Sequence, residues 1–229
     1  MSNRTGIFLQ VRLGSSRLPG KALLEIEGKA IITHAMQALS AVDIDCRAIL
    51  TDSSSANRLK PLAAASGFSL FEGAAEDVLD RYVSAAAEYG VDTIIRATGD
   101  NPLVDAEAAG LILQNHIECN ADYSGFDDMP LGTGVEVLKT SALRAAANQS
   151  DDSYDHEHVS PYLYKNPTLF KINRFRAPER FCLPGSAVTV DTPDDFEYIR
   201  GLYAALYKGK PLTITDIIPW LRENRRAHE

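Results

Sequence analysis

The sequence predicts an α/β protein with one mostly parallel sheet flanked by helices. Over the first two-thirds of the chain, short apolar runs typical of buried strands alternate with segments whose apolar residues recur at helical spacing. Such alternation is typical of βαβ units, in which the strands pair in parallel. The length of 229 residues suits one domain of generous size, so we expect a single domain over residues 1–229.

The first expected unit comprises four segments. Residues 7–11 (IFLQV) form a nearly continuous apolar run, which indicates a buried strand, and residues 31–39 repeat apolar side chains at helical spacing. A second short run at 48–51 (AILT) predicts a strand, and the polar, Ala-rich stretch at 55–66 predicts a helix. These segments together describe a strand–helix–strand–helix unit.

The next segments repeat the same order. Residues 68–71 (FSLF) predict a third strand and residues 76–89 a helix. Residues 93–97 (TIIRA) predict a fourth strand, which ends in the turn TGDNP. A further helix is expected at 106–117, with Asp105 as its N-cap.

The alternation of strands and helices ends after Asn120. Gly and Pro are frequent between positions 125 and 134 and indicate turns. A strand at 135–138 follows these turns. No Ser/Gly-rich linker separates residues 120–180 from the rest, so we interpret this stretch as a small inserted subdomain that elaborates the main domain. The chain then returns to a strand at 188–190 and a helix. A final helix is expected to carry on its solvated face and tail Arg222, Arg225 and Arg226.

The composition excludes several broad classes of protein. A formal charge of −8 at pH 7 gives the wrong field for a general binder of nucleic acid or of anionic membranes. No apolar run approaches the roughly 20 residues that span a bilayer, and the apolar stretch at the start is too short for a secretory leader. Three cysteines without a CxxC pair fit free thiols in a reducing compartment. We therefore expect a cytoplasmic protein.

The segment after the first predicted strand carries the strongest sign of chemistry. Glycines allow backbone N–H groups to approach an anion, while guanidinium and ammonium groups neutralise it. Because the segment directly follows a strand, it is placed at the carboxyl edge of the sheet, where α/β folds bind ligands. We interpret it as a polyphosphate-binding loop, in preference to an ordinary basic surface loop, on the basis of Arg12, Gly14, Ser15, Ser16, Arg17, Gly20 and Lys21.

Two common phosphate motifs do not describe this loop. Five residues separate Gly14 from Gly20, one more than in a Walker A loop, and Ala22 stands where that loop needs Ser or Thr. No GxGxxG occurs, since Gly132-Thr133-Gly134 lacks the third glycine of a dinucleotide fingerprint. The loop therefore belongs to a different phosphate-binding class.

Asp100 and Asp191 are candidate metal ligands. Each is expected to follow a strand, so the fold can bring both carboxylates to the basic loop, where they would hold one Mg²⁺ that keeps waters or phosphate oxygens as its other ligands. Each residue also has a structural alternative. Asp191 suits a helix N-cap ahead of Pro193, and Asp100 suits an Asp turn before Pro102.

The motifs resemble those of a known family. QVRLGSSRLPGK, TGDNPL, HEHVSPY and VDTPDDFEYI, in this order over most of the chain, are similar to the cytidylyltransferases that activate sugar acids. The closest resemblance is to the branch of spore coat polysaccharide biosynthesis protein F. More distant relatives are the CMP-Kdo synthetases and the CMP-sialic acid synthetases (acylneuraminate cytidylyltransferases). The resemblance implies a Rossmann-like nucleotidyltransferase sheet, CTP as co-substrate, Mg²⁺ as cofactor and pyrophosphate as product.

The resemblance also implies roles for individual residues. The nucleotide would be bound by Arg12, Gly14, Ser15, Lys21 and Thr98. The catalytic set would be Arg12, Lys21, Asp100 and Asp191, with Asp100 and Asp191 as the metal ligands. The chain departs from the CMP-Kdo synthetases at Thr98-Gly99-Asp100, where they carry Gln-Gly-Asp. The GAAEDVLDRY segment resembles an acidic helix of the family, and its Asp77 and Arg81 have the i,i+4 spacing of a surface ion pair.

The acceptor side is expected within residues 120–180, which would also form the interface of a homodimer. The candidate acceptor-binding residues are Arg17, Tyr123, Glu136, His156 and His158. Glu136 has the alternative of being the outward residue of a half-buried strand. His156 and His158 have no third metal ligand near them in sequence, which argues against a metal pair.

The function that these features predict is Mg²⁺-dependent transfer of CMP from CTP to a sugar acid or related acceptor, in the synthesis of polysaccharide or surface-glycan precursors. Two alternatives remain open at this stage. One is a transferase of other nucleotide specificity, including a glycosyltransferase, although those enzymes usually present an Asp-x-Asp pair and the chain has Asp100-Asn101. The other is a non-catalytic nucleotide-binding partner of a polysaccharide pathway, which would not need the two carboxylates.

Overall fold

The computed structural model describes residues 3–224. Seven of its strands form one sheet in the order β5-β4-β1-β6-β8-β7-β9. Only β8 runs against the other six, since it is antiparallel to both β6 and β7. The strands are β1 (Thr5–Gln10), β4 (Cys46–Thr51), β5 (Ser69–Glu72), β6 (Thr93–Thr98), β7 (Tyr123–Asp127), β8 (Glu136–Lys139) and β9 (Ile172–Arg176), and a separate two-stranded ribbon pairs β2 (Glu25–Ile26) with β3 (Lys29–Ala30).

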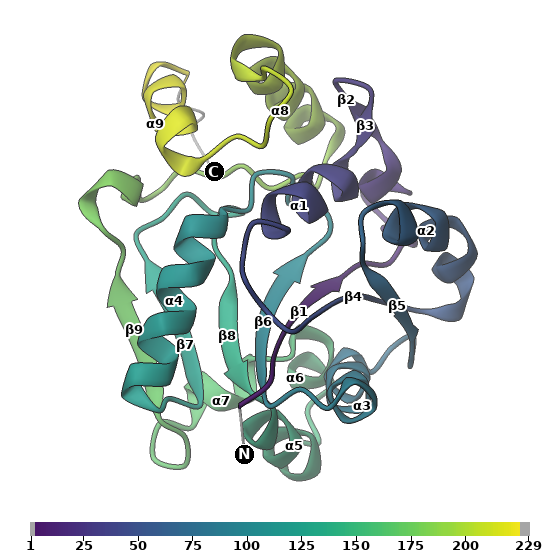
Figure 1. Cartoon of the computed structure of the whole chain (residues 1–229), viewed down its shortest axis with the longest axis vertical. Coiled ribbons are helices and arrows are strands. Elements are labelled where there is room, and N and C mark those ends of the chain that lie inside the picture. The colour runs from purple at the N-terminus through teal and green to yellow at the C-terminus, as the bar shows by residue number, and fades with distance from the viewer. Residues whose placement is uncertain (1–2, 225–229) are drawn as a thin grey trace.

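Helices cover both faces of the sheet and one end of it (Figure 1). In chain order they are η1 (Lys21–Leu23), α1 (Ile31–Leu39), α2 (Ser53–Ala65), α3 (Val78–Tyr89), α4 (Ala106–Cys119), α5 (Thr140–Gln149), α6 (Ser153–His158), α7 (Pro161–Lys165), η2 (Glu179–Phe181), α8 (Pro193–Leu206) and α9 (Ile214–Glu223). Among the described residues, no helix combines the length and apolar character that crossing a membrane requires.

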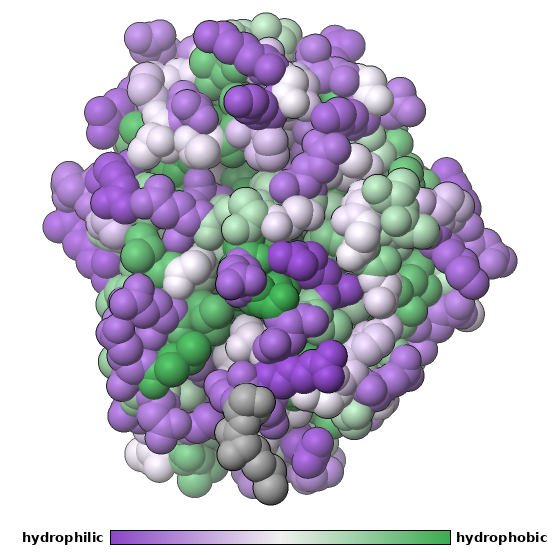
Figure 2. Space-filling view, in the orientation of Figure 1, coloured by the Kyte–Doolittle hydropathy of each residue, from purple (hydrophilic) through white to green (hydrophobic). Residues whose placement is uncertain are grey.

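Alternate residues of β1 face opposite sides of the sheet, as the period of a strand requires. Ile7 and Leu9 belong to the apolar core beneath α1, α2 and α4, whereas Phe8 belongs to the core beneath α3 and α5. A third core joins α8 and α9 to η2 and to the start of α1. Figure 2 shows hydrophilic side chains over much of the outer surface on this side, with apolar side chains between them along α4.

The centre of the sheet brings two loops together at its carboxyl edge. Strands β1 and β6 pair in parallel with Gln10 opposite Thr98, and the Gly99 N–H donates to the Gln10 carbonyl at 2.8 Å. A Cβ at Gly99 would lie 3.0 Å from the Cβ of Val11, so the close approach of the two loops requires glycine at this position. The basic loop and the TGDNP turn are therefore neighbours.

The predicted sheet and the helices around it are confirmed, with ends that differ from the expected ones by no more than two residues. The strand expected at 188–190 is wrong. These residues join no strand, and the nearest pairing is an isolated bridge between Leu131 and Ala187. Their alternating pattern has another cause, because Val188 and Val190 are buried in the core beneath α8 and α9.

Residues 120–180 supply β7, β8 and β9 to the main sheet and also α5, α6 and α7. The sequence indicated only β8 clearly, since β7 contains Gly125 and β9 carries three polar residues. The role of this stretch in acceptor binding and dimerisation stays a prediction. At the end of the chain Arg222 is exposed on α9, and Arg225 and Arg226 lie outside the described residues.

Candidate active site

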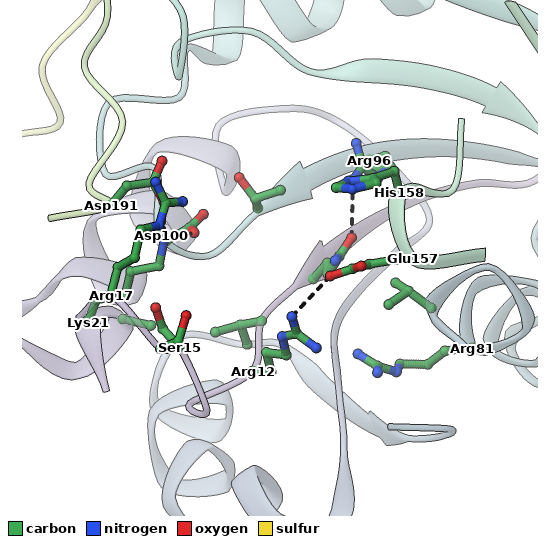
Figure 3. A pocket seen from close by; sticks show the side chains of 16 residues that line it. Arg12, Ser15, Arg17, Lys21, Arg81, Arg96, Asp100, Glu157, His158 and Asp191 are labelled. Atoms are coloured by element: carbon green, nitrogen blue, oxygen red, sulfur yellow. Dashed lines mark hydrogen bonds and ion pairs between the residues drawn. The ribbon is translucent and has the colours of Figure 1, made fainter. Parts of the chain in front are cut away.

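A pocket of about 340 Å³ lies at the carboxyl ends of β1 and β6 (Figure 3). One side is formed by the basic loop at residues 12–21, the TGDNP turn and the segment before α8. The other side is formed by the start of α3 and the end of α6. Eight of the candidate nucleotide-binding, metal-binding and acceptor-binding residues line it, namely Arg12, Ser15, Arg17, Lys21, Thr98, Asp100, His158 and Asp191. The sequence pattern therefore identified most of the charged wall of the pocket.

Lys21 is the centre of the charged cluster. Gly20, with φ 68°, turns the loop into η1 and its N–H bonds the Leu13 carbonyl at 3.0 Å, which places Lys21 under the pocket. The ammonium lies 2.5 Å from Asp100 and 2.7 Å from Asp191, and the side chain is only 11% exposed. Burial lowers the pKa of Lys21, but the two carboxylates outweigh burial and raise it above its ordinary value.

The two candidate metal ligands thus converge on one cation, although 90 residues lie between them in sequence. Asp191 is not the N-cap that its sequence context also suggested, because Thr192 caps α8 in a capping box with Asp195. The turn at Asp100 is closed by its neighbours, with the Asn101 side-chain amide donating to Thr98 Oγ1 at 2.6 Å. Both carboxylates are therefore available to the pocket.

The chemistry of this donor pair suits Mg²⁺. Hard carboxylate oxygens are the protein ligands that Mg²⁺ prefers, and it usually takes only one or two of them besides water and phosphate. Asp100 and Asp191 are about one-third exposed and line the pocket, so their oxygens are accessible to a cation. No group of three or more His, Cys, Asp or Glu residues suited to a metal occurs among the described residues. The two residues fit an ion that arrives with a nucleotide.

Two arginines of the loop reach into the pocket from its exposed rim. Arg17 lies 3.1 Å from Asp191, and Arg12 lies 3.1 Å from Glu157 of α6, with both guanidinium groups about half or more exposed. Ser15 lines the pocket, and its hydroxyl accepts a long bond of 3.4 Å from the Leu18 N–H. Gly14 shapes the loop without lining the pocket.

The structure does not bring Tyr123 and Glu136 to the pocket. Glu136 accepts from Arg96 at 2.6 Å, from the Tyr123 hydroxyl at 3.0 Å and from the Ser160 hydroxyl at 2.5 Å. Burial, together with the charge of Glu136, raises the pKa of Tyr123. Burial lowers the pKa of Arg96, but Glu136 more than offsets this and raises it. Glu136 is therefore the centre of a network that supports Arg96 from behind, and Arg96 itself lines the pocket.

His156 also lies outside the pocket lining and holds α6 in place. Its Nδ1 lies 2.7 Å from Asp77 Oδ2, and its Nε2 lies 2.9 Å from the Ser150 carbonyl. Since both ring nitrogens face acceptors, the doubly protonated imidazolium is favoured. The pKa of His156 is raised by the Ser150 carbonyl and, despite some burial, by Asp77. His158, by contrast, lines the pocket and packs on the Tyr154 ring at 4.3 Å.

We expect the contribution of His156 to stability to depend on pH. Because its folded-state pKa is raised, the contribution is fully present below the unfolded pKa of about 6.5 and is lost as pH rises through the folded value. The difference in free energy of unfolding between wild type and His156→Gln should be larger at pH 5 than at pH 8, by at most about 1 kcal/mol for so exposed a pair. Urea unfolding at the two pH values measures it, and equal differences would contradict the imidazolium.

Asp77 and Arg81 do not form the surface ion pair that was one interpretation of their i,i+4 spacing. Asp77 instead caps α3 through the Asp80 N–H at 2.8 Å, while Arg81 is 1% exposed and donates from Nε to the Ala74 carbonyl at 2.8 Å. Gly73 allows this, because a Cβ there would lie 2.7 Å from Arg81 Cγ. Arg81 reaches the pocket from α3, which periodicity alone did not reveal (Figure 3).

Three further lining residues escaped the sequence interpretation: Gln10, Arg96 and Glu157. Signals existed for two of them. Arg96 is a lone charge inside an otherwise apolar strand, and Gln10 is a polar residue at the end of another, both of which suggest a ligand-facing role. Glu157 lies between His156 and His158, and the candidate roles in this segment were given to the two histidines.

Comparison with known proteins places this geometry in a family. The family model described as Cytidylyltransferase matches residues 7–214. The Spore coat polysaccharide biosynthesis protein SpsF of Bacillus subtilis is 34% identical over 228 residues, covering 96% of this chain and 95% of that protein. A cytidylyltransferase from Leptospira borgpetersenii superimposes with a TM-score of 0.89 at 26% identity, covering 97% of this chain and 95% of that one.

A more distant structure shares the fold. The CMP:2-keto-3-deoxy-manno-octonic acid synthetase complexed with CTP superimposes with a TM-score of 0.67 at 20% identity, covering 88% of this chain and 99% of that one. The family model spans the basic loop, the TGDNP turn and Asp191, which are the parts that meet in the pocket. On its sequence and its fold, the chain belongs to the cytidylyltransferase family.

Proposed function

We propose that the protein transfers CMP from CTP to the oxygen of a sugar acid or related acceptor, with Mg²⁺ as cofactor and pyrophosphate as the leaving group. The observation that carries this proposal is the convergence of Asp100, Asp191 and Lys21 under a loop that also offers Arg12 and Arg17. Such a cluster presents cations to a triphosphate and oxygens to its metal within one cavity.

The roles follow from position. Lys21 and Arg12 bind the triphosphate and neutralise the charge that develops on the departing pyrophosphate. Asp100 and Asp191 hold the metal, which when bound supplies charge neutralisation at the phosphate oxygens. Thr98 and Ser15 line the same cavity and complete the polar wall. No covalent intermediate is required, since positioning and charge supply most of the rate in phosphoryl chemistry.

The acceptor assignments remain part of the proposal. Arg17 and His158 line the pocket and are the side chains that we assign to hydrogen-bond an anionic acceptor group, because a desolvated carboxylate without a partner is costly. Tyr123, Glu136 and His156 act behind the lining and support its residues. A pathway that makes polysaccharide or surface-glycan precursors in the cytoplasm, and a homodimer formed through residues 120–180, complete the proposal. The free thiols of Cys46, Cys119 and Cys182 suit a reducing compartment.

Pyrophosphate release from CTP tests the proposal directly. We expect release with Mg²⁺ and one member of a panel of sugar acids, polyols and phosphorylated acceptors, and none when a chelator removes the metal. ATP, GTP and UTP in place of CTP test the alternative nucleotide specificity. CTP binding without turnover of any acceptor would favour a non-catalytic nucleotide-binding partner.

A further inference from the structure

Glu157 is the one carboxylate among the described pocket-lining residues that is not held by Lys21. Asp100 and Asp191 both contact the Lys21 ammonium. Glu157 comes from α6, on the opposite side of the cavity, and its ion-pair partner among the described residues is Arg12 at 3.1 Å. Figure 3 shows this pair at the middle of the pocket, between the Lys21 cluster and the wall that carries Arg96 and His158.

Arg12 is also one of the residues to which the proposed function assigns the triphosphate. The Arg12–Glu157 pair is about half exposed on both sides, so it is a weak contact that a polyphosphate displaces at small cost. A guanidinium that turns to the phosphates leaves the Glu157 carboxylate without a cation. The carboxylate then faces the cavity as a hydrogen-bond acceptor next to the bound nucleotide.

The segment that carries Glu157 is held firmly on both sides. His156 is bonded to Asp77 and to the Ser150 carbonyl, and Ser160 is bonded to Glu136. Between them Val159 has φ 73° and ψ −55°, and the Ser160 N–H donates to the His158 carbonyl at 2.9 Å. This is a γ-turn with positive φ, a rare and strained form, here at a fully buried β-branched residue. Strain of this kind persists where the surrounding structure fixes a functional side chain.

We propose that Glu157 is the general base that activates the acceptor, and hence that the acceptor reacts through a hydroxyl group. This inference rests on the proposed cytidylyl transfer. As the acceptor oxygen bonds to the α-phosphorus, its O–H bond breaks and the proton passes to a Glu157 oxygen. The bond from the α-phosphorus to the bridging oxygen breaks at the same time, and its electron pair leaves with pyrophosphate. A phosphate or phosphonate acceptor is already ionised and would need no such base.

The test compares Glu157→Gln with a matched control, Glu197→Gln. Glu197 also pairs with an arginine, Arg200 on α8, and lies outside the pocket. With the hydroxyl acceptor identified by the panel, we expect Glu157→Gln to lower kcat about 100- to 10,000-fold. CTP affinity, measured by calorimetry, should stay unchanged or rise up to about fivefold, because a competitor for Arg12 is removed. Glu197→Gln should change neither quantity.

A second variant separates catalysis from positioning. Formate supplied to Glu157→Ala is expected to restore turnover at least about tenfold, since it replaces a missing base but not a missing structural contact. A kcat within about threefold of wild type for Glu157→Gln, a fall in its CTP affinity, or no rescue by formate would each overturn the inference. If the wild type itself releases no pyrophosphate with any acceptor, the proposed function fails first, which is a different result.

Discussion

Lys21→Met is expected to weaken CTP binding and to strengthen the binding of Mg²⁺ in the absence of nucleotide. Loss of a charge-assisted contact to the triphosphate should reduce CTP affinity about 10- to 100-fold. The ammonium also occupies the carboxylate oxygens of Asp100 and Asp191. Its removal leaves Asp100 without its cation and Asp191 with only the exposed Arg17 as an ion-pair partner among the described residues, so a divalent ion no longer has to displace the ammonium. Calorimetric titration with CTP and, separately, with magnesium chloride measures both effects.

The substitution should change the affinities for CTP and for Mg²⁺ in opposite directions, which a general loss of structure would not do. Lys29→Met is the control, because Lys29 is a part-buried lysine outside the pocket that bonds Gln37 and Tyr207 and, within residues 3–224, pairs with no carboxylate. It should leave both affinities at the wild-type value. A Lys21 variant that loses CTP affinity without gaining Mg²⁺ affinity would contradict the assignment of the carboxylate pair to the metal. Unchanged CTP affinity would remove the main support for the proposed function.

Glu136→Leu is expected to lower the free energy of unfolding by about 3 kcal/mol, the lower end of the range for breaking a buried ion pair. Arg96 and Glu136 are 16% and 23% exposed, so the substitution leaves a largely buried guanidinium without its counter-ion. It also removes the acceptor of the Tyr123 and Ser160 hydroxyls. For a chain of this length, the loss corresponds to a fall in Tm of roughly 6–12 °C.

The companion variants identify charge as the cause. Glu136→Gln keeps an acceptor oxygen and should be less destabilised than Glu136→Leu. The double variant Arg96→Met, Glu136→Leu should recover part of the loss, because no charge is then left unpaired. Lys139→Met, at the other end of β8, breaks a more exposed pair with Asp122 and should cost less than about 1 kcal/mol. A double variant that is less stable than Glu136→Leu would contradict this account.

The sequence predicted the layered fold because its signals are local. A strand such as β1 is an apolar run. Capping residues such as Asp105 mark helix starts, and the Ala108 N–H does donate a hydrogen bond to the Asp105 carboxylate. Residues 188–190 show the limit of this approach. An apolar alternation reports burial alone, and burial beneath α8 and α9 gives the same pattern as burial in a sheet.

The candidate site likewise contains residues that a local motif predicts and residues that only tertiary packing brings together. The basic loop is contiguous in sequence, so its cations could be named from one motif. Arg81, Arg96 and Glu157 come from three elements and meet only through tertiary packing. Glu136 was expected to face an acceptor. It lies behind the pocket lining instead, because it bonds Arg96, and Arg96 is the residue that lines the pocket. No local rule distinguishes a carboxylate that binds substrate from one that orients an arginine.

The pairing of Lys21 with two aspartates and of Arg12 with Glu157 has a consequence for product release. The cations that would grip a triphosphate already have counter-ions supplied by the chain itself. Nucleotide entry is therefore an exchange of partners, and the same carboxylates compete for those cations again once the α-phosphorus bond has broken. Under the proposed function, the carboxylates would compete with pyrophosphate for Lys21 and Arg12 from fixed positions, at a high local concentration. The ion pairs that nucleotide binding displaces would thus favour the release of pyrophosphate when they form again.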